Sequence, residues 1–146
     1  MHRKSLHYSF LNGKVVKKSL PSFRGPTDPA PVLKRLLLPQ GELAQFYDSD
    51  EPIRYLAYIE LREGGVRGNH YHEVKEEVIY VIQGELVLAV EDIDSRTRDS
   101  VPLTAGDLVS IPKRVAHALR TEKAGHAIEL STSRFRASDT YRHAVL

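Results

Sequence analysis

Short runs of apolar residues recur along the chain from Val32 onward, and Gly, Pro, Asp or Ser separates most of them. The runs are VLKRLLLP, ELAQFY, IRYLAYIEL, EEVIYVI, ELVLAVEDI, DLVSIP, HALRT and HAIELS. Runs of this length that are rich in β-branched and aromatic residues predict strands rather than helices. Many short strands joined by glycine turns favour an all-β sandwich or barrel.

The first 31 residues do not share this pattern. They are interrupted by Gly13, Pro21, Gly25, Pro26, Pro29 and Pro31. Any strand in this segment is therefore expected to be short or peripheral. We predict an irregular N-terminal arm over residues 1–31, packed on the domain or on a partner subunit, and one β-barrel domain over residues 32–146. A chain of 146 residues is long enough for one domain with its own core.

Composition excludes several classes of protein and of site. Hydrophobic residues make up 41% and charged residues 27% of the chain, which is typical of a globular protein. The net charge of +2 comes from interspersed acids and bases, so no nucleic-acid partner is expected. No apolar run approaches membrane-spanning length, and we expect a cytoplasmic protein without a membrane partner. Because there is no Cys, a metal site must use imidazole and carboxylate ligands.

The stretch GNHYHEVKEEVIYVIQGE, residues 68–85, concentrates the candidate chemistry. Alternate side chains of a strand share a face, so His70 and His72 project the same way if this segment is extended. The competing helix would place His72 and Glu76 one turn apart. The β-branched run that begins at Val78 disfavours the helix and favours the strand.

Glu77 lies five residues after His72, which would place it on the other face of one straight strand. We therefore infer a turn within residues 73–76 and a second strand that starts at Glu77. In this interpretation the two strands pair as a hairpin, which returns the carboxylate to the histidines and leaves Glu76 as a turn or surface residue. Imidazole and carboxylate together suit a divalent metal ion.

The spacing also resembles the first motif of the cupin superfamily. Five residues separate Gly64 from His70, one separates His70 from His72, four separate His72 from Glu77 and six separate Glu77 from Gly84.

Downstream, AGDLVSIPKRVAHALRT resembles the second cupin motif through Gly106, Pro112 and His117. Two positions differ from that motif. Arg114 stands where a glycine is usual, which bears on the geometry of a tight turn, and Thr121 stands where an asparagine is usual.

The resemblance implies an all-β, double-stranded β-helix (jelly-roll, cupin) barrel. It also implies one divalent metal ion held by His70, His72, Glu77 and His117. Three imidazoles and one carboxylate leave coordination positions for oxygen atoms of a substrate. The sequence does not separate Zn, Mn, Fe and Ni.

Residues that flank the two motifs are candidates for the lining of a substrate pocket: Arg67, Tyr58, Tyr80 and Arg120. The alternative for each is a surface or packing role. Either arginine would suit a carboxylate or phosphate group. The remaining histidines match no ligand spacing and are expected to be solvated or hydrogen-bonded: His2, His7, His126 and His143.

Three functions stay open at this point. The segment GGVRGNHYH resembles cupins that act on nucleotide sugars, which implies a metal-dependent isomerase or epimerase acting on a sugar or another small oxygenated molecule. Some of those enzymes work without metal through a histidine base and a tyrosine acid, which here would be His70 and a tyrosine. The alternatives are an Fe(II)-dependent dioxygenase and a non-catalytic sugar-binding cupin. By analogy with other cupin barrels we expect a homodimer, with the arm as an element that subunits exchange.

Overall fold

The computed structural model describes residues 6–26 and 31–146. Within these ranges the regular structure is almost entirely strand, with one 3₁₀ turn, η1 (Ala137–Asp139). The strands are β1 (Leu6–Phe10), β2 (Val15–Ser19), β3 (Ser22–Phe23), β4 (Lys34–Leu38), β5 (Gly41–Gln45), β6 (Tyr55–Leu61), β7 (Val66–Tyr71), β8 (Glu77–Asp92), β9 (Arg98–Thr104), β10 (Asp107–Ile111), β11 (Val115–Ser131) and β12 (Tyr141–Arg142). No helix within the described ranges is long and apolar enough to cross a membrane.

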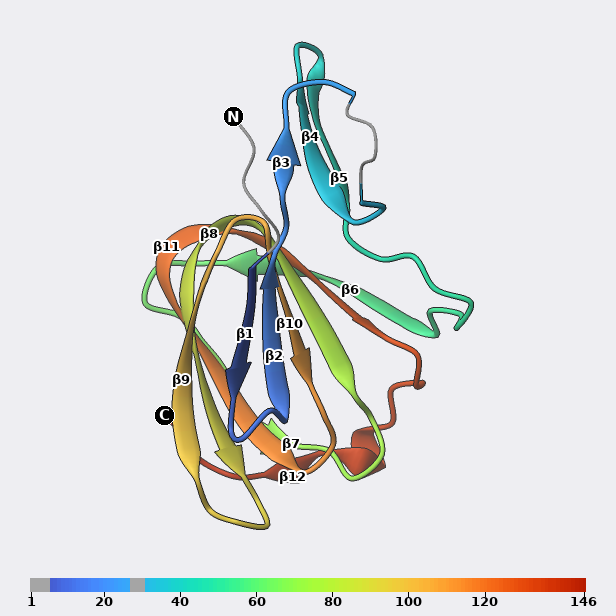
Figure 1. The fold of residues 1–146 in the computed structure, drawn as a ribbon. Helices are drawn as coiled ribbons and strands as arrows, with labels where there is room; N and C mark the ends of the chain where they lie inside the picture. Colours follow the sequence, from blue (N-terminus) through green and yellow to red (C-terminus); the bar gives the residue numbers. More distant parts are fainter. Residues whose placement is uncertain (1–5, 27–30) are drawn as a thin grey trace.

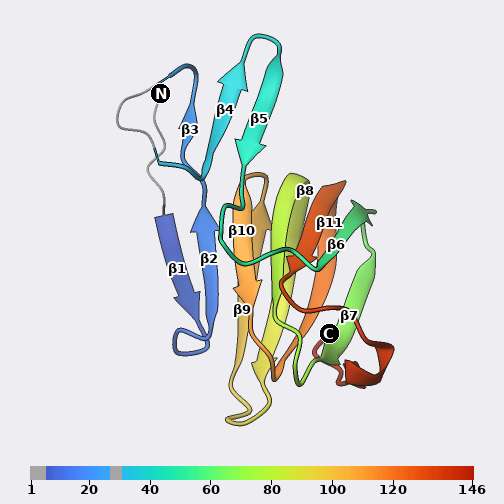
Figure 2. The same ribbon diagram turned by 90° about the vertical axis from the view of Figure 1, so that its right-hand side faces the viewer.

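Two long strands, β8 and β11, belong to two walls at once. In the first wall, residues 77–83 of β8 lie between β10 and residues 126–130 of β11, and β6 pairs with the far side of β11. In the second wall, residues 85–92 of β8 lie between β9 and residues 115–121 of β11, and β7 and β12 follow. Figures 1 and 2 show the two walls facing each other. This is the predicted jelly-roll fold.

The long strands pass from one wall to the other at glycines. Gly84 has a φ of 110°, and a Cβ on Gly125 would lie 1.8 Å from the carbonyl oxygen of Gln83. The register between β8 and β11 shifts in the same region, between Thr121 and Ala127. Because only glycine permits this approach and this backbone angle, these residues allow both strands to bend together.

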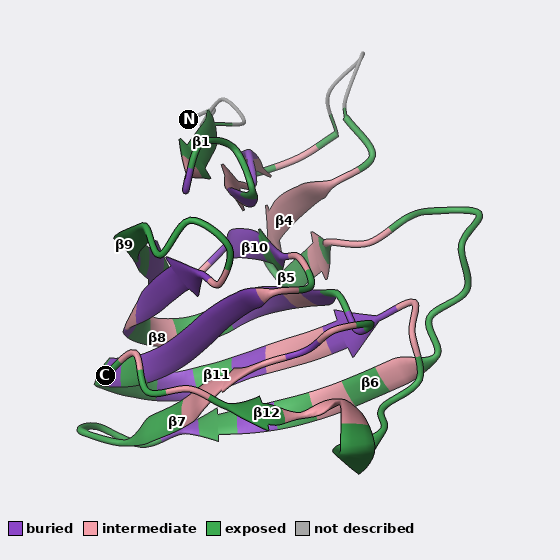
Figure 3. Cartoon of the chain, turned by 90° about the horizontal axis from the view of Figure 1, so that it is seen from below, coloured by how far each residue is buried: buried purple, intermediate pink, exposed green. Residues whose placement is uncertain are grey.

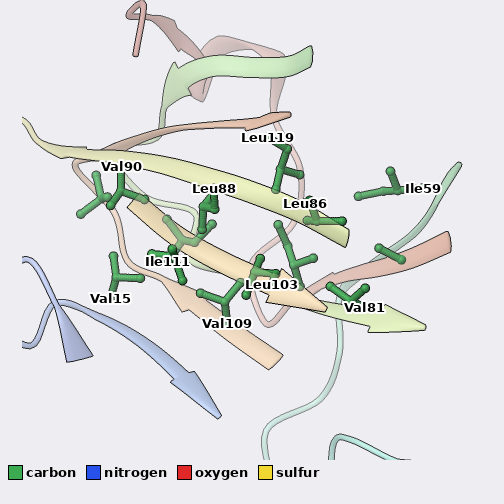
Figure 4. Packing of buried hydrophobic residues seen from close by; sticks show 14 of the residues in the cluster. Val15, Ile59, Val81, Leu86, Leu88, Val90, Leu103, Val109, Ile111 and Leu119 are labelled. Atoms are coloured by element: carbon green, nitrogen blue, oxygen red, sulfur yellow. The ribbon is translucent and has the colours of Figure 1, made fainter. Parts of the chain in front are cut away.

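The hydrophobic core fills the space between the walls. Figure 4 shows Leu86, Leu88 and Val90 of β8 packing with Val109 and Ile111 of β10. Most residues of β8 are buried, whereas β6 alternates between exposed positions and half-buried or buried ones (Figure 3). The alternation on β6 is expected for a strand with one face on the core and the other toward solvent.

The N-terminal segment is more regular than the sequence analysis predicts. β1 and β2 form a hairpin, and β2 extends the first wall by pairing with β10 (Figure 2). Leu11 and Val15 are buried in the core. The turn contains Asn12 and Gly13 with positive φ, and an Asn-Gly pair between two extended runs is a strong hairpin signal. The domain boundary after residue 31 stays a prediction.

A small sheet of β3, β4 and β5 projects beyond the end of the first wall (Figures 1 and 2), and Ala44 of β5 packs against the outer side of that wall. Phe46, which follows β5, stacks on the ring of Tyr80 in β8 with centroids 4.3 Å apart. Leu20 and Leu108 are buried in the same cluster. The outward-facing side of β8 is therefore buried here, although it lies outside the main core.

Leu88 tests the main core. It is fully buried, so Leu88→Ala is expected to lower the free energy of unfolding by about 2–5 kcal/mol through lost burial and a new cavity. Urea denaturation measures the change. Leu43→Ala is the matched control, because Leu43 is 53% exposed, and its effect is expected within about 0.5 kcal/mol. Equal losses in the two variants would contradict the assigned core.

Candidate metal centre

Four side chains with metal-ligand chemistry meet inside the barrel. His70 lies in β7, His72 just after it, Glu77 at the start of β8 and His117 in β11. One potential ligand atom from each of the four lies within 4.8 Å of all the others. His72, Glu77 and His117 are buried, and His70 is half-buried. The structure thus brings together the four residues that the cupin resemblance implies.

The close pairing of β7 and β11 sets the positions of two histidines. His70 pairs with His117, and the register shifts between His117 and Ala118. Gly68 has a φ of 102°, and a Cβ there would lie 2.7 Å from the carbonyl oxygen of His117. A larger residue at this position would push β7 away from β11 and separate the two imidazoles.

The predicted hairpin between the two motif strands is wrong. Glu77 reaches the histidines by a different route. β7 pairs with β11 on one edge and β12 on the other, so neither edge is open to β8. Residues 73–76 instead cross from the second wall to the first. The Glu77 carboxylate therefore meets His72 and His117 across the barrel interior, not along a strand pair of β7 and β8.

Backbone carbonyls fix the tautomers of two ligands. Nδ1 of His72 lies 2.9 Å from the carbonyl oxygen of Asp139, and Nδ1 of His117 lies 3.1 Å from that of Val115. A carbonyl oxygen only accepts hydrogen bonds, so each Nδ1 carries the proton and donates it. In the neutral rings, Nε2 then carries a free lone pair, as a metal ligand requires.

Both Nε2 atoms face the same carboxylate. Nε2 of His72 is 2.8 Å from Oε1 of Glu77, and Nε2 of His117 is 3.2 Å from Oε2. Lone pairs and carboxylate oxygens repel one another, so the group requires positive charge at its centre, either as ring protons or as a divalent cation. Three imidazoles and one carboxylate in this arrangement fit a divalent ion of the Zn, Mn, Fe and Ni group.

The pKa values of the cluster reflect this mutual attraction. Burial would raise the pKa of Glu77, but the adjacent His117 holds it well below its usual value. Burial would lower the pKa of His117, but the Glu77 carboxylate holds it above its usual value. Burial, followed by the charge of His117, lowers the pKa of His70 to about 4. His70 is therefore neutral near pH 7, which metal ligation requires.

A buried lysine, which sequence reasoning missed, lies beside this cluster. Nζ of Lys75 is 3.3 Å from Oε1 of Glu77 and 3.8 Å from Oε2 of Glu129. It also lies 4.1 Å from the ring centre of Tyr55 and 5.4 Å from that of Phe135. Lys75 belongs to the turn that the sequence analysis places between His72 and Glu77, and no spacing signal indicates that its side chain points inward.

A cavity of about 320 Å³ opens onto the cluster. Its apolar lining includes Ile59, Ile79 and Leu119, and His70, Glu77, His117 and Glu129 contribute polar groups. Burial, followed by the charge of Glu77, raises the pKa of Glu129 to about 7. The cavity is large enough for a small organic molecule and brings it next to the four ligands.

Two of the four predicted pocket residues border this cavity, Arg67 and Tyr58. The side chain of Tyr58 is nevertheless 61% exposed, and its hydroxyl group hydrogen-bonds Nδ1 of His126 on the outer surface. Tyr55 lies on the inner face of β6 together with Ala57 and lines the cavity. Tyr55, three positions earlier on the strand, therefore faces the cavity, whereas Tyr58 only borders it.

The other two predicted pocket residues, Tyr80 and Arg120, do not line the cavity. Tyr80 is buried under the ring of Phe46, and Arg120 is exposed and pairs with Glu122 at 3.2 Å. Their neighbours Ile79 and Leu119 face the cavity. Because side chains alternate along a strand, Tyr80 and Arg120 point away from it.

The histidines outside the ligand set have other positions. His143 contacts Oε2 of Glu91 at 2.9 Å, and His126 contacts Tyr58 as described above. His7 is exposed on β1, and His2 lies outside the described residues. Within the described part of the chain, none of them joins the ligand cluster.

Asp139 holds the turn that carries Lys75. Its carboxylate accepts hydrogen bonds from the backbone N–H groups of Glu73 at 2.9 Å, Val74 at 3.2 Å and Lys75 at 3.0 Å. Its own carbonyl oxygen accepts from His72. One residue of the C-terminal segment thus fixes both the turn and a ligand ring.

Arg114 keeps the tight turn of the second motif without the usual glycine. Its φ is 61°, in the left-handed region that costs a non-glycine residue energy. Its guanidinium lies 2.7 Å from carboxylate oxygens of Glu73 and Asp94, and its backbone N–H donates to the carbonyl oxygen of His72 at 2.7 Å. These contacts stabilise the turn and tie it to the ligand strand.

Together the two walls and the enclosed cluster define a jelly-roll protein with a His/Glu group positioned to hold a metal ion. The family model described as "Cupin domain" matches residues 57–132, just over half of the chain. The chain belongs to the cupin family.

Solved structures share this fold. A 3,4-ketoisomerase from Helicobacter canadensis is 19% identical with a TM-score of 0.66, and the match covers 75% of this chain and 86% of that one. The dTDP-6-deoxy-D-glucose-3,5-epimerase of Legionella pneumophila Philadelphia 1, in complex with dTDP-4-keto-L-rhamnose, is 13% identical with a TM-score of 0.72, covering 95% and 77%. At these identities the likeness shows the fold. No curated protein sequence matches the chain.

The role of Asp139 can be tested by Asp139→Asn. An amide cannot replace the carboxylate toward three N–H donors, so the free energy of unfolding at pH 7 should fall by about 1–3 kcal/mol. Burial would raise the pKa of Asp139, but the N–H groups of Lys75, Glu73 and Val74 hold it below its usual value. The stabilisation is thus present above the unfolded-state pKa and is lost as the pH falls through the lower, folded-state pKa.

The difference in the free energy of unfolding between the unmodified protein and Asp139→Asn should therefore shrink below about pH 4, the ordinary pKa region of an aspartate. Urea denaturation across pH 3 to 7, roughly the range in which aspartates titrate, measures it. Asp99→Asn, at an exposed position of β9, is the matched control. A difference that stays constant with pH would contradict the assigned role.

Proposed function

We propose that this cupin is a metal-dependent isomerase or epimerase that acts on a sugar or another small oxygenated molecule. The observation that carries the proposal is a His/Glu group at the wall of a cavity that also contains a carboxylate outside the ligand set, Glu129. The names of similar folds support it, since they include a 3,4-ketoisomerase and a 3,5-epimerase. Both reactions require a proton to leave a carbon next to a carbonyl group.

The proposed roles follow from the chemistry of each group. A divalent ion held by His70, His72, Glu77 and His117 would supply Lewis-acid polarisation of a carbonyl oxygen. We assign the transfer of the proton to Glu129, because it lines the cavity and is not a ligand. The apolar side chains around it would exclude water, and Arg67 at the border suits an anionic group of the substrate.

A metal-free variant of this chemistry uses a histidine base and a tyrosine acid. His70 and Tyr55 both line the cavity, so they are the pair that such a mechanism would use. The fixed tautomers of His72 and His117 favour the metal-dependent form, because both rings present Nε2 to the same point.

Metal binding itself is tested by His72→Ala and Glu77→Ala. Each removes one ligand, so elemental analysis of the purified proteins should show the metal content falling from about one ion per chain to well below that value. His126→Ala is the matched control, because His126 lies on the outer surface. Unchanged metal content in the first two variants would refute the assigned ligand set.

The reaction class is tested by solvent exchange. In D₂O the metal-loaded protein, incubated with a panel of 4-keto and 3-keto nucleotide sugars, should incorporate deuterium next to the carbonyl group, which NMR detects. Glu129→Gln should slow exchange by about 100-fold or more, since general acid–base groups typically contribute that much. Glu122→Gln, at an exposed position, should leave the rate unchanged.

Absence of exchange and of product across the panel with each of the four metals would contradict the isomerase proposal. Oxygen consumption by the iron-loaded protein would instead indicate a dioxygenase. Binding without turnover would indicate a sugar-binding cupin.

We also propose that the protein forms a homodimer. Large apolar side chains on the outer surface support this, because Leu56, Tyr58 and Ile82 are each more than two-fifths exposed. Sedimentation equilibrium should give a mass of two chains. A mass of 16.5 kDa, that of one chain, would overturn the proposal.

A further inference from the structure

The proposed metal centre already contains a buried cation. Lys75 is 4% exposed, and its ammonium lies 3.3 Å from Oε1 of Glu77, the oxygen that also faces His72. The faces of Tyr55 and Phe135 surround the ammonium on other sides. Since a buried ammonium is costly without a partner, the contact with Glu77 is a significant part of what allows Lys75 to be buried.

Glu77 cannot serve Lys75 and a divalent ion equally well. Both compete for the same oxygen, and two cations a few ångströms apart repel strongly where water is excluded. Metal binding therefore requires the Lys75 charge to be balanced elsewhere.

Glu129 is the group that can balance it. Its Oε2 lies 3.8 Å from the same ammonium, and it is only 17% exposed. Glu129 is not among the four residues whose ligand atoms converge within the described part of the chain. It can thus receive Lys75 without occupying a ligand position.

We propose that Lys75 is an internal counter-ion, which Glu77 exchanges for the metal ion and which Glu129 receives. The inference rests on the proposed metal dependence and adds a determinant of metal affinity. Lys75 opposes metal binding by holding Glu77. Glu129 favours metal binding by drawing Lys75 away, so it is a positioning residue for the metal in addition to its proposed catalytic role.

The test measures Zn²⁺ affinity by competition with a chromophoric chelator. Four full-length proteins are compared: the unmodified chain, Lys75→Met, Glu129→Gln and the double variant. Both substitutions preserve approximate size, and each removes one charge when the assay pH is above the pKa of about 7 of Glu129. Lys75→Met should bind Zn²⁺ at least about tenfold more tightly, because a repelling charge is lost, and Glu129→Gln at least about tenfold more weakly.

The double variant separates an indirect effect from a direct one. If Glu129 acts through Lys75, adding Glu129→Gln to Lys75→Met should change the affinity by less than about threefold, because no ammonium remains to return to Glu77. An equal loss in both backgrounds would mean that Glu129 attracts the metal directly, which would overturn the proposal. A tighter affinity for Lys75→Met also excludes simple structural damage, which would weaken binding.

A surface ion pair provides the matched control. Lys123 and Glu85 lie 3.1 Å apart and are well exposed, so Lys123→Met and Glu85→Gln should leave the affinity unchanged within about twofold. Circular dichroism checks folding. If Lys75→Met does not fold, Lys75→Gln takes its place in the single and the double variant with the same expected results, and an unchanged affinity of Glu129→Gln overturns the exchange in either case.

The result also distinguishes this inference from the proposed function. An unmodified protein that shows no saturable binding of Zn²⁺, Mn²⁺, Fe²⁺ or Ni²⁺ would overturn both. Normal binding by the unmodified protein with unchanged affinities in every variant would overturn the counter-ion exchange alone.

Discussion

The structure depends on one arrangement of charge: a buried carboxylate that faces the lone-pair nitrogens of two imidazoles. Glu77 approaches His72 at 2.8 Å and His117 at 3.2 Å, and both rings are held by hydrogen bonds to backbone carbonyls. This cluster is stable only if positive charge joins it. The adjacent ammonium of Lys75 can supply that charge. A cation held by the four convergent ligand atoms would supply it as well.

Much of the fold could be predicted because strands leave a strong local signal. Short β-branched runs and glycine turns indicate the all-β class, and the spacing of two motifs indicates the jelly roll. The pairing of strands could not be read in the same way. Glu77 was expected to return by a hairpin, yet β11 and β12 occupy both edges of β7. Pairing partners far apart in sequence are set by the packing of the whole barrel. The hairpin around Asn12 and Gly13 carried a local signal that the sequence analysis did not use, because the irregular arm was predicted from the prolines of the segment, which begin only at Pro21.

In the candidate site, too, some residues could be identified from the sequence and others could not. Ligands that lie at motif spacings were identified from the sequence, whereas Lys75, Glu129 and Asp139 were not, because their contacts depend on side-chain directions and on long-range packing that no spacing encodes. Alternation would have separated Tyr55 from Tyr58 once the inner face of β6 was known. At Arg114 the sequence departs from the motif, yet the tight turn is kept. Two ion pairs of the Arg114 side chain compensate for the cost of its positive φ.

The hydrogen bond from His72 to Asp139 has a consequence for assembly during synthesis. His70, His72 and Glu77 emerge from the ribosome well before Asp139, the residue that orients one ring and holds the turn. Until that later segment docks and β12 pairs with β7, His72 lacks its acceptor, and the turn lacks the carboxylate that orders it. The arrangement of the four side chains is therefore complete only after β12 has been made and has paired with β7, which couples the geometry of the cluster to completion of the barrel.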